Sequence, residues 1–248
     1  MNMAADLREI GRLLIVGMAR SGIAAALAAR RSLPDVEVVV SDMDEKPEAA
    51  SDVEALMEAG VRVELANEDY SLLDGCGLVV KSPGVPGDIA LLEEAFQRGI
   101  PVWGEIEFAW RFLTNFVVGV TGTNGKTTTT ELITHILSSA GRPGHAAGNV
   151  GTALSNFVGN IDEDELLVTE LSSFQLEDII EFRPDVAVLL NMSEDHLDRY
   201  SCPEDYYAAK MNIFVNQQPD DLAVINLDDP LCHHPVPVSV GKVWFSRS

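Results

Sequence analysis

Short apolar runs rich in valine, isoleucine and leucine recur along the chain, and they alternate with longer segments whose apolar positions have helical spacing. This alternation is typical of βα units around a mostly parallel sheet, because strands covered on both faces are apolar throughout. The sequence therefore predicts an α/β fold. The expected strands are 13–17, 36–41, 61–65, 78–81, 116–121, 166–171, 185–191 and 222–226, and the expected helices are 21–32, 48–59, 89–97, 126–140 and 203–216.

Two strand–loop–helix turns of the phosphate-binding type, after Val16 and after Thr121, predict two domains. The break is expected near 101–105, where a short strand and a glycine lead into an aromatic helix. We expect a Rossmann-like domain over 1–104 and a P-loop-type ATPase domain with a mostly parallel sheet over 105–248. The last apolar run, 243–245, is strand-like and no helix follows it, so the second domain is expected to be incomplete.

Charge and cysteine usage narrow the class of protein. The 39 acidic and 17 basic residues give a net charge of -22, which repels nucleic acid and anionic membranes. Cys76, Cys202 and Cys232 are far apart, so neither a disulfide framework nor a zinc site is indicated. No signal-like start and no run of about 18 apolar residues occurs. A soluble, cytoplasmic protein is expected.

The segment 116–129 joins an apolar strand to a helix through the glycine-rich turn GTNGKT. Backbone N–H groups and the helix dipole converge on a phosphate in such a turn, and Lys126 would neutralise β- and γ-phosphate charge. Thr127 would place its hydroxyl on Mg²⁺. The usual GxxxxGK[ST] spacing requires glycine at Val120, so the loop is a variant.

A second strand, 166–170, ends in Glu170, the place from which P-loop enzymes reach Mg²⁺ with an acidic ligand. Ser172 and Gln175 follow at once and could orient phosphate or carboxylate oxygens, although by themselves these residues are more typical of helix capping.

A third strand leads into the charged segment 192–200, again at the edge where open α/β sheets bind ligands. His196 could ligate a metal or pair with a surface carboxylate, and the spacing leaves both readings open. Lys210 lies on the following helix, where the pattern alone gives it no role.

The first loop, GMARSG at 17–22, follows a strand and precedes a helix, and Asp42 ends the next strand. The dinucleotide fingerprint needs glycine where this chain has Ala19, so the loop favours a nucleotide diphosphate over NAD. Ser82 lies after the strand 78–81, at a ligand-facing edge that a plain turn would also explain.

The chain resembles the Mur ligases over essentially its whole length. The resemblance is carried by GTNGKTTT at 122–129, GNVG at 148–151, ELSSFQLE at 170–177, NMSEDHLDRY at 191–200 and YYAAK at 206–210. GTNGKT alone is shared with folylpolyglutamate synthases, whereas the later motifs are closest to the ligase that adds D-glutamate. The resemblance implies that ATP phosphorylates the carboxylate of UDP-N-acetylmuramoyl-L-alanine in the cytoplasm, and that D-glutamate attacks the acyl phosphate during peptidoglycan synthesis.

The resemblance also implies roles for particular residues. Thr127 and Glu170 would hold one Mg²⁺, and His196 with a carbamylated Lys210 would hold a second. The catalytic set would be Lys126, Glu170, His196 and Lys210. The ATP loop would comprise Gly122, Thr123, Asn124, Gly125, Lys126, Thr127 and Thr128. The muramoyl substrate would contact Asn149, Ser172 and Gln175, and UDP would contact Arg20, Ser21, Asp42 and Ser82.

Two departures from the family pattern bear on function. The loop GMARSG differs from the family's GxGxTG-like version, which affects Arg20 and Met43 most. Family members also have a third domain that supplies adenosine and D-glutamate contacts, so we expect this chain to bind substrate but to ligate poorly. A monomer is expected. The alternatives are another Mur ligase, a folylpolyglutamate synthase-like ligase, or an inactive nucleotide-binding module.

Overall fold

The structure, a computed structural model, describes residues 7–44, 50–67, 69–195, 199–233, 237 and 240–247. By packing, the chain divides into two compact units. Unit 1 comprises 1–113 and 153–161, and unit 2 comprises 114–152 and 162–248. No helix in the described ranges is long and apolar enough to cross a membrane.

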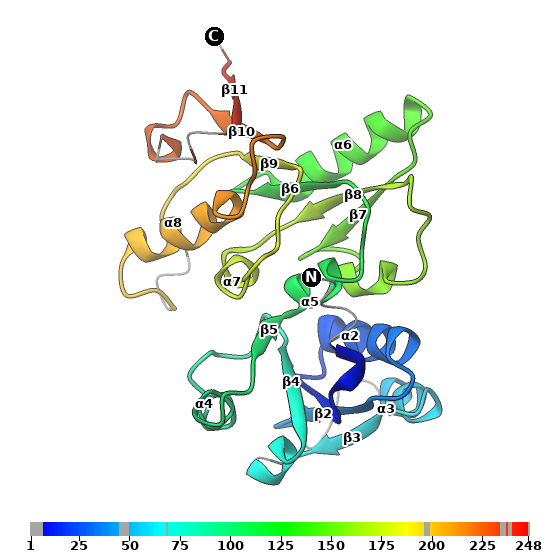
Figure 1. Ribbon diagram of the computed structural model, residues 1–248. Helices are drawn as coiled ribbons and strands as arrows, with labels where there is room; N and C mark the ends of the chain where they lie inside the picture. The colour runs from blue at the N-terminus through cyan, green and yellow to red at the C-terminus, as the bar shows by residue number, and fades with distance from the viewer. Residues whose placement is uncertain are drawn as a thin grey trace. The chain divides into compact units, whose positions relative to one another are not determined.

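Unit 1 contains a five-stranded sheet in the order β3-β2-β1-β4-β5, in which every pairing is parallel (Figure 1). Its strands are β1 (Arg12–Val16), β2 (Glu37–Asp42), β3 (Arg62–Leu65), β4 (Cys76–Lys81) and β5 (Val102–Gly104). Its helices are α2 (Arg20–Ser32), α3 (Ala50–Glu58), α4 (Ala90–Gln97) and α5 (Glu105–Trp110), with short turns η1 (Leu7–Glu9), η2 (Tyr70–Leu73) and η3 (Leu154–Phe157).

The central strands of unit 1 are continuous apolar runs because their side chains are buried in the core of the unit. One buried cluster joins side chains of the central strands to those of η2 and α4, and it comprises Leu14, Val16, Val39, Leu72, Leu73, Val79, Leu91, Leu92 and Ala95. Because the chain leaves β1 toward β2 on one side and β4 lies on the other, the strand order reverses beside β1. Ligands bind outside the carboxyl ends of strands at such a reversal.

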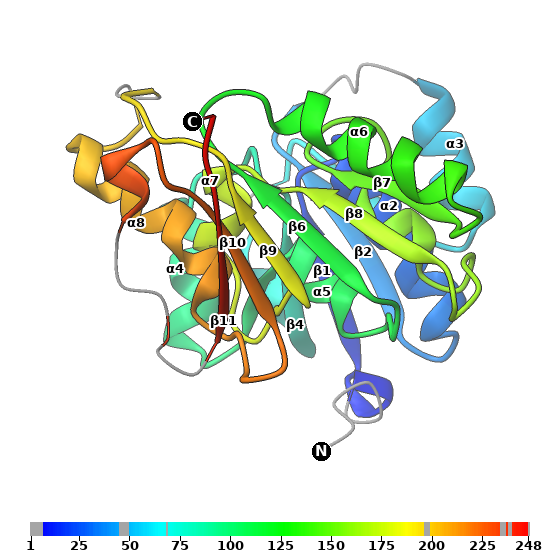
Figure 2. The ribbon, with the colours of Figure 1, turned by 90° about the horizontal axis from the view of Figure 1, so that it is seen from above.

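Unit 2 contains a six-stranded parallel sheet in the order β11-β10-β9-β6-β8-β7 (Figure 2). Its strands are β6 (Val117–Thr121), β7 (Gly144–Gly148), β8 (Leu166–Glu170), β9 (Val186–Leu189), β10 (Leu222–Asn226) and β11 (Gly241–Phe245). The helices are α6 (Lys126–Ser139), α7 (Ser173–Glu177) and α8 (Pro203–Met211), with η4 (Asn212–Phe214) and η5 (Pro230–Cys232). Here the order reverses beside β6, whose loop therefore lies at the ligand-binding edge.

The α/β prediction is confirmed: both sheets are mostly parallel. Strand β7 was not anticipated, because the sequence GHAAG has none of the β-branched residues that mark strands. The packing division also differs from the expected boundary after residue 104. Helix α5 packs on α2 and η3 and so lies in unit 1, and residues 153–161 of the β7–β8 connection join that unit as well.

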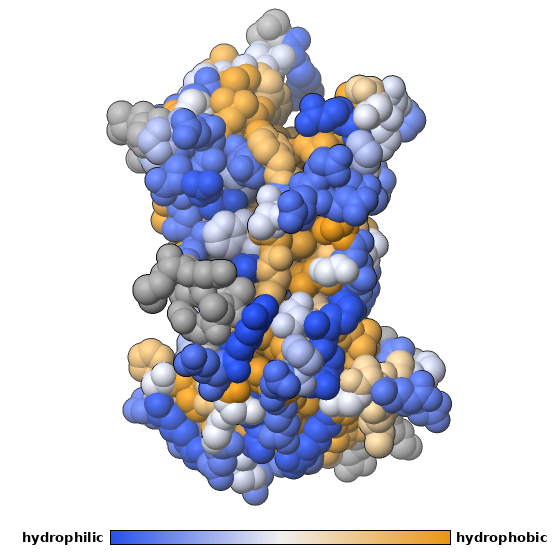
Figure 3. Space-filling view, turned by 45° about the vertical axis from the view of Figure 1, so that its right-hand side comes forward, coloured by the Kyte–Doolittle hydropathy of each residue, from blue (hydrophilic) through white to orange (hydrophobic). Residues whose placement is uncertain are grey.

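On the face in Figure 3, hydrophilic residues predominate and hydrophobic residues form smaller areas among them. Large apolar side chains that are nevertheless exposed include Leu132 and Ile136 on α6 and Trp244 on β11.

Gly22, in the first turn of α2, has no room for a side chain. A Cβ there would lie 1.9 Å from Gly17 O and 2.8 Å from Ser82 Oγ. We expect Gly22→Ala to destabilise the protein by about 2 kcal/mol, because the helix must shift away from the loop after β1. Urea unfolding measures this. Gly87→Ala is the control, since its Cβ would meet nothing within 4 Å, and an equal loss in both variants would contradict the steric explanation.

Glu105, at the start of α5, is a buried carboxyl group whose Oε1 accepts a hydrogen bond from Ser155 N–H at 2.7 Å. Burial raises the pKa of Glu105 against the lowering effect of Ser155. Between the ordinary pKa of a glutamate and this raised value the folded protein holds a proton that the unfolded chain has lost. The contribution of Glu105 to stability is therefore present at low pH and is lost as pH rises through that window.

We expect Glu105→Gln to keep the acceptor for Ser155 and to abolish this pH-dependent loss. The variant should gain stability over the wild type as pH rises above about 4.5, the ordinary pKa of a glutamate side chain. Chemical denaturation of both proteins from acidic to neutral pH measures the difference, in which the contributions of other carboxylates cancel. A constant difference across the range would contradict the assignment.

Candidate functional site

The loop after β6 is shaped by two glycines with positive φ. Gly122 has φ of +152° and Gly125, the residue before α6, has φ of +82°. A Cβ on Gly122 would lie 3.0 Å from Leu190 Cβ and 3.2 Å from Asn191 N, so the loop approaches the end of β9 closely. Val120 is fully buried within β6. The phosphate-type loop therefore begins at Gly122, which explains why the usual upstream glycine is not needed.

Lys126 folds back over its own loop. Its Nζ donates to Gly122 O and to Thr123 O, both at 3.0 Å. The first N–H groups of a helix have no intrahelical acceptor, so those of Lys126, Thr127 and Thr128 at the start of α6 are suited to an anion. The N–H groups of Thr123 and Asn124 are engaged instead with Asn191, by bonds of 3.0 and 2.9 Å.

Glu170 lies at the end of β8, beside the loop, and is almost completely buried. Its Oε2 accepts a hydrogen bond from Thr127 Oγ1 at 2.7 Å, and its Oε1 accepts one from Asn149 Nδ2 at 3.1 Å. The structure thus brings together the two residues expected to hold one Mg²⁺. A carboxylate and a hydroxyl are oxygen ligands of the type that Mg²⁺ prefers.

Lys210 of α8 is buried, and its Nζ donates to Gly122 O at 3.0 Å, the same oxygen that Lys126 contacts. Burial, reinforced by the charge of Lys126, lowers the pKa of Lys210 to about 7. Asp195 and Glu170 act in the opposite direction. An amine with a pKa of about 7 is about half neutral at pH 7 and can then act as a nucleophile, whereas an ordinary surface lysine is almost fully protonated.

His196 lies outside the described residues. Among those that are described, no group of three or more His, Cys, Asp or Glu side chains is placed to hold a metal ion. Tyr206 and Arg199 border the same edge: Tyr206 Oη donates to Thr123 Oγ1 at 3.3 Å, and Lys210 Nζ lies 4.4 Å from the Tyr206 ring centroid. The Arg199 guanidinium lies over the Phe174 ring.

Ser172 and Gln175 form a capping box at the start of α7. Ser172 Oγ accepts from Gln175 N–H at 3.3 Å, and Gln175 Oε1 accepts from Ser172 N–H at 3.0 Å. The capping role that the sequence allowed is therefore present, and contact of these residues with a substrate stays a prediction.

In unit 1, the predicted residues gather at the carboxyl ends of β1, β2 and β4. Asp42 Oδ2 accepts from Met18 N–H at 2.5 Å, and its Oδ1 accepts from Asp44 N–H at 3.0 Å. Ser82 Oγ donates to Gly17 O at 2.9 Å and so ties the loop after β4 to the loop after β1. Ser82 is buried, which suits this structural bond more than direct contact with a ligand.

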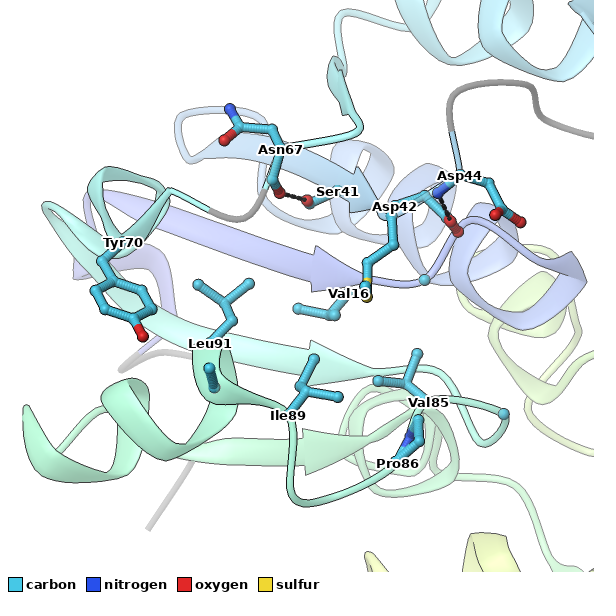
Figure 4. Close-up of a pocket in the computed structure, with 14 residues that line it drawn as sticks. Val16, Ser41, Asp42, Asp44, Asn67, Tyr70, Val85, Pro86, Ile89 and Leu91 are labelled. Carbon is cyan, nitrogen blue, oxygen red and sulfur yellow. Dashed lines mark hydrogen bonds between the residues drawn. The ribbon is translucent and has the colours of Figure 1, made fainter.

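A cavity of about 280 Å³ opens between these loops (Figure 4). Val85, Pro86 and Ile89 form an apolar wall, and Asp42 and Asp44 lie on the opposite side. A second cavity of about 500 Å³ is lined by Arg20 and Asp42 among others. Two of the residues predicted to contact UDP, Arg20 and Asp42, thus line the same cavity. Ser21 follows Arg20 in the first turn of α2.

The sequence analysis did not identify two residues of unit 2 that hold the phosphate-type loop after β6. Asn191 binds the loop apex, and Tyr206 contacts Thr123. Polar residues at the end of a strand were the available signal for Asn191, whereas Tyr206 gave none, since a tyrosine on a helix is ordinary core.

Known proteins are similar to this chain over most of its length. Residues 120–239 match the family model of the Mur ligase middle domain. The UDP-N-acetylmuramoylalanine–D-glutamate ligase of Koribacter versatilis is 41% identical over 242 residues, which cover 95% of this chain and 52% of that protein. The ligase of the same name from Geotalea uraniireducens is 46% identical over 222 residues, covering 89% and 48%. The chain thus spans about half the length of these relatives.

Among solved structures, the UDP-N-acetylmuramate:L-alanyl-γ-D-glutamyl-meso-diaminopimelate ligase from Neisseria meningitides has the same fold, with a TM-score of 0.65 at 19% identity. The match covers 95% of this chain and 78% of that one. The matched family model begins inside β6 and so includes the phosphate-type loop, Glu170 and Lys210. Over residues 120–239 the chain therefore carries the Mur ligase middle domain.

Proposed function

We propose that the protein is an ATP-dependent ligase that joins D-glutamate to UDP-N-acetylmuramoyl-L-alanine through an acyl phosphate. One observation carries the proposal: Lys126 and Lys210 converge on Gly122 O, beside a carboxylate held by Thr127 and Asn149. Two cationic or nucleophilic nitrogens and one buried carboxylate then surround the place where the phosphate-type loop would hold a triphosphate. This arrangement suits phosphoryl transfer, in which positioning and charge neutralisation do most of the work.

The reaction places separate demands on the two units. In unit 2, Lys126 would exchange its two carbonyl acceptors for phosphate oxygens, while the first turn of α6 donates N–H groups to the same anion. Attack of the substrate carboxylate oxygen on the γ-phosphorus gives the acyl phosphate and ADP. Attack of the D-glutamate nitrogen on the acyl carbon then breaks the bond from that carbon to the phosphate oxygen, so that phosphate leaves, the nitrogen loses a proton and the amide forms.

Mg²⁺ fits the residues that are present. Glu170 and Thr127 would hold one ion, which would neutralise charge on the transferring phosphoryl group. We further propose that Lys210 reacts with carbon dioxide to give a carbamate, which would replace a cation by a carboxylate-like oxygen donor and, with His196, hold a second ion. The lowered pKa of Lys210 supports this step, because only the neutral amine adds to carbon dioxide.

In unit 1, the cavity of about 280 Å³ is proposed to take the UDP end of the substrate. Its apolar wall suits a flat base, and Asp42 offers carboxylate oxygens to donor groups on that base or its ribose. The 1–104 and 105–248 functional division, action in the cytoplasm and a monomeric state belong to the same proposal.

The proposal is tested by supplying ATP, Mg²⁺ and UDP-N-acetylmuramoyl-L-alanine to the protein extended to the length of its relatives. Phosphate release that requires D-glutamate, and not L-alanine, L-lysine or diaminopimelate, is expected. Preference of the extended protein for another amine, or for a folate substrate, would overturn the assignment.

A further inference from the structure

The apex of the phosphate-type loop is held by the end of β9. The side-chain amide of Asn191 bonds both backbone groups of Asn124. Its Oδ1 accepts from Asn124 N–H, and its Nδ2 donates to Asn124 O, each at 2.9 Å. The backbone oxygen of Asn191 accepts from Thr123 N–H at 3.0 Å. Thr123 Oγ1 also accepts from Ser193 N–H at 3.0 Å. These bonds fix residues 123 and 124 to the neighbouring strand.

The end of β9 is held in turn by two residues at the end of β10, the next strand of the sheet: Asn226, its last residue, and Asp229, three residues further on. Asn226 Nδ2 donates to Leu190 O at 2.7 Å. Asp229 Oδ2 accepts from Met192 N–H at 2.8 Å, and its Oδ1 accepts from Leu231 N–H at 3.0 Å. Asp229 therefore links Met192, the residue after Asn191, to the turn in which Asp229 itself lies.

A loop that is glycine-rich needs such support. Gly122 and Gly125 supply the positive φ angles that the turn requires, but glycine also gives the unbound loop more freedom to lose on binding. A loop already held in its binding shape avoids that loss. Since the N–H groups of Thr123 and Asn124 are used for support, the start of α6 is left to hold the anion.

We propose that Asn191 is a positioning residue for the phosphate-type loop, and that Asp229 and Asn226 hold Asn191 in place. This inference rests on the proposed function, because it assumes that the loop binds the phosphates of a nucleotide. Neither Asn191 nor Asp229 needs to touch the nucleotide itself; the effect on affinity passes through residues 123 and 124.

The test compares Mg·ADP binding to the wild type, Asn191→Ala and Asp229→Asn by titration calorimetry. Removing both side-chain bonds to Asn124 should weaken Mg·ADP binding about tenfold, and Asp229→Asn about threefold, which corresponds to about 0.7 kcal/mol for each lost bond. Hydrogen exchange in residues 122–128 should quicken in both variants, with exchange in β6 and β8 unchanged. A residue with a merely structural role would alter exchange throughout unit 2.

Asp228→Asn is the matched control. Asp228 neighbours Asp229 but accepts from Ser246 Oγ at 2.7 Å and Arg247 N–H at 2.8 Å, away from β9. It should bind Mg·ADP as the wild type does. If Asn191→Ala fails to fold, Asp229→Asn decides the outcome.

The possible results are distinguishable. A wild type that binds no Mg·ADP overturns the nucleotide-binding function and this inference together. A wild type that binds, with Asn191→Ala and Asp229→Asn binding equally well, overturns only the positioning role. Equal weakening in Asp228→Asn also overturns it, because the effect would then not pass through β9.

Discussion

Lys126→Met is expected to weaken Mg·ADP binding by at least about a hundredfold, since charge-assisted hydrogen bonds to phosphate are among the strongest in proteins. Lys126 Nζ donates to Gly122 O and Thr123 O, so its position over the loop is fixed by the loop's own carbonyl groups. Methionine has a similar length and no charge, and it therefore removes the cation while keeping most of the packing. Titration calorimetry with Mg·ADP measures the change.

The control for Lys126→Met is UDP binding, which the proposed function assigns to unit 1. It should stay within about twofold of wild type, well under 1 kcal/mol. Lys242→Met is a matched lysine variant on β11, where the side chain is exposed. Unchanged Mg·ADP affinity in Lys126→Met would contradict the assignment of the loop to phosphate.

Lys210→Ala is expected to abolish D-glutamate ligation in the protein extended to the length of its relatives, and short carboxylic acids are expected to restore part of it. The carbamate of Lys210 would supply an oxygen donor that alanine lacks, and a small carboxylate could occupy the space. Removing a group that orders a metal around a transferring phosphoryl group costs on the order of a hundredfold or more in rate. The measurement is D-glutamate-dependent phosphate release with and without the acids.

The carbamate itself has a direct readout. Wild-type protein exposed to ¹³C-labelled bicarbonate should show a carbamate carbon signal that Lys210→Ala lacks. The signal should grow as pH rises through about 7, because deprotonation of Lys210 exposes the lone pair that attacks carbon dioxide. Wild-type activity in Lys210→Ala without added acid would return this lysine to the role of a buried structural residue.

The sequence predicted the parts of this fold that depend on periodicity. Buried strands such as β1, β6 and β8 are continuous apolar runs, and their ends place Asp42, the phosphate-type loop and Glu170 at the ligand-binding edge. Elements with weak local signals were missed. Strand β7 is glycine- and alanine-rich, and it is held as a strand by its pairing with β8.

The limits of sequence reasoning are equally visible in the site. Local pattern indicated that Lys126, Thr127 and Glu170 act together, because their spacing follows from strand–loop–helix geometry. Pattern gave Lys210 no role, since its importance arises from burial beside Gly122 O, a contact between residues far apart in sequence. For the same reason the bonds from Asn191 to Asn124 could not be predicted.

The inclusion of residues 153–161 in unit 1 also escaped prediction. These residues lie in sequence between β7 and β8 of unit 2, and a reading along the chain assigns them there. Their burial decides otherwise: Ala153, Leu154 and Ser155 are fully buried, and Arg31 Nη2 donates to Val158 O at 3.0 Å. Contacts at long sequence separation, here between α2 and η3, are not encoded in local periodicity.

The proposed binding of a UDP-linked muramoyl substrate by this chain is tested most directly by thermal unfolding in the presence of candidate ligands. UDP-N-acetylmuramoyl-L-alanine should raise the melting temperature, since a ligand that binds only the folded state stabilises it, and does so more as its concentration rises above the dissociation constant. UDP should do so less, and a folate or NAD should not. Stabilisation by a folate or NAD, with none by the UDP-muramoyl compound, would contradict the account.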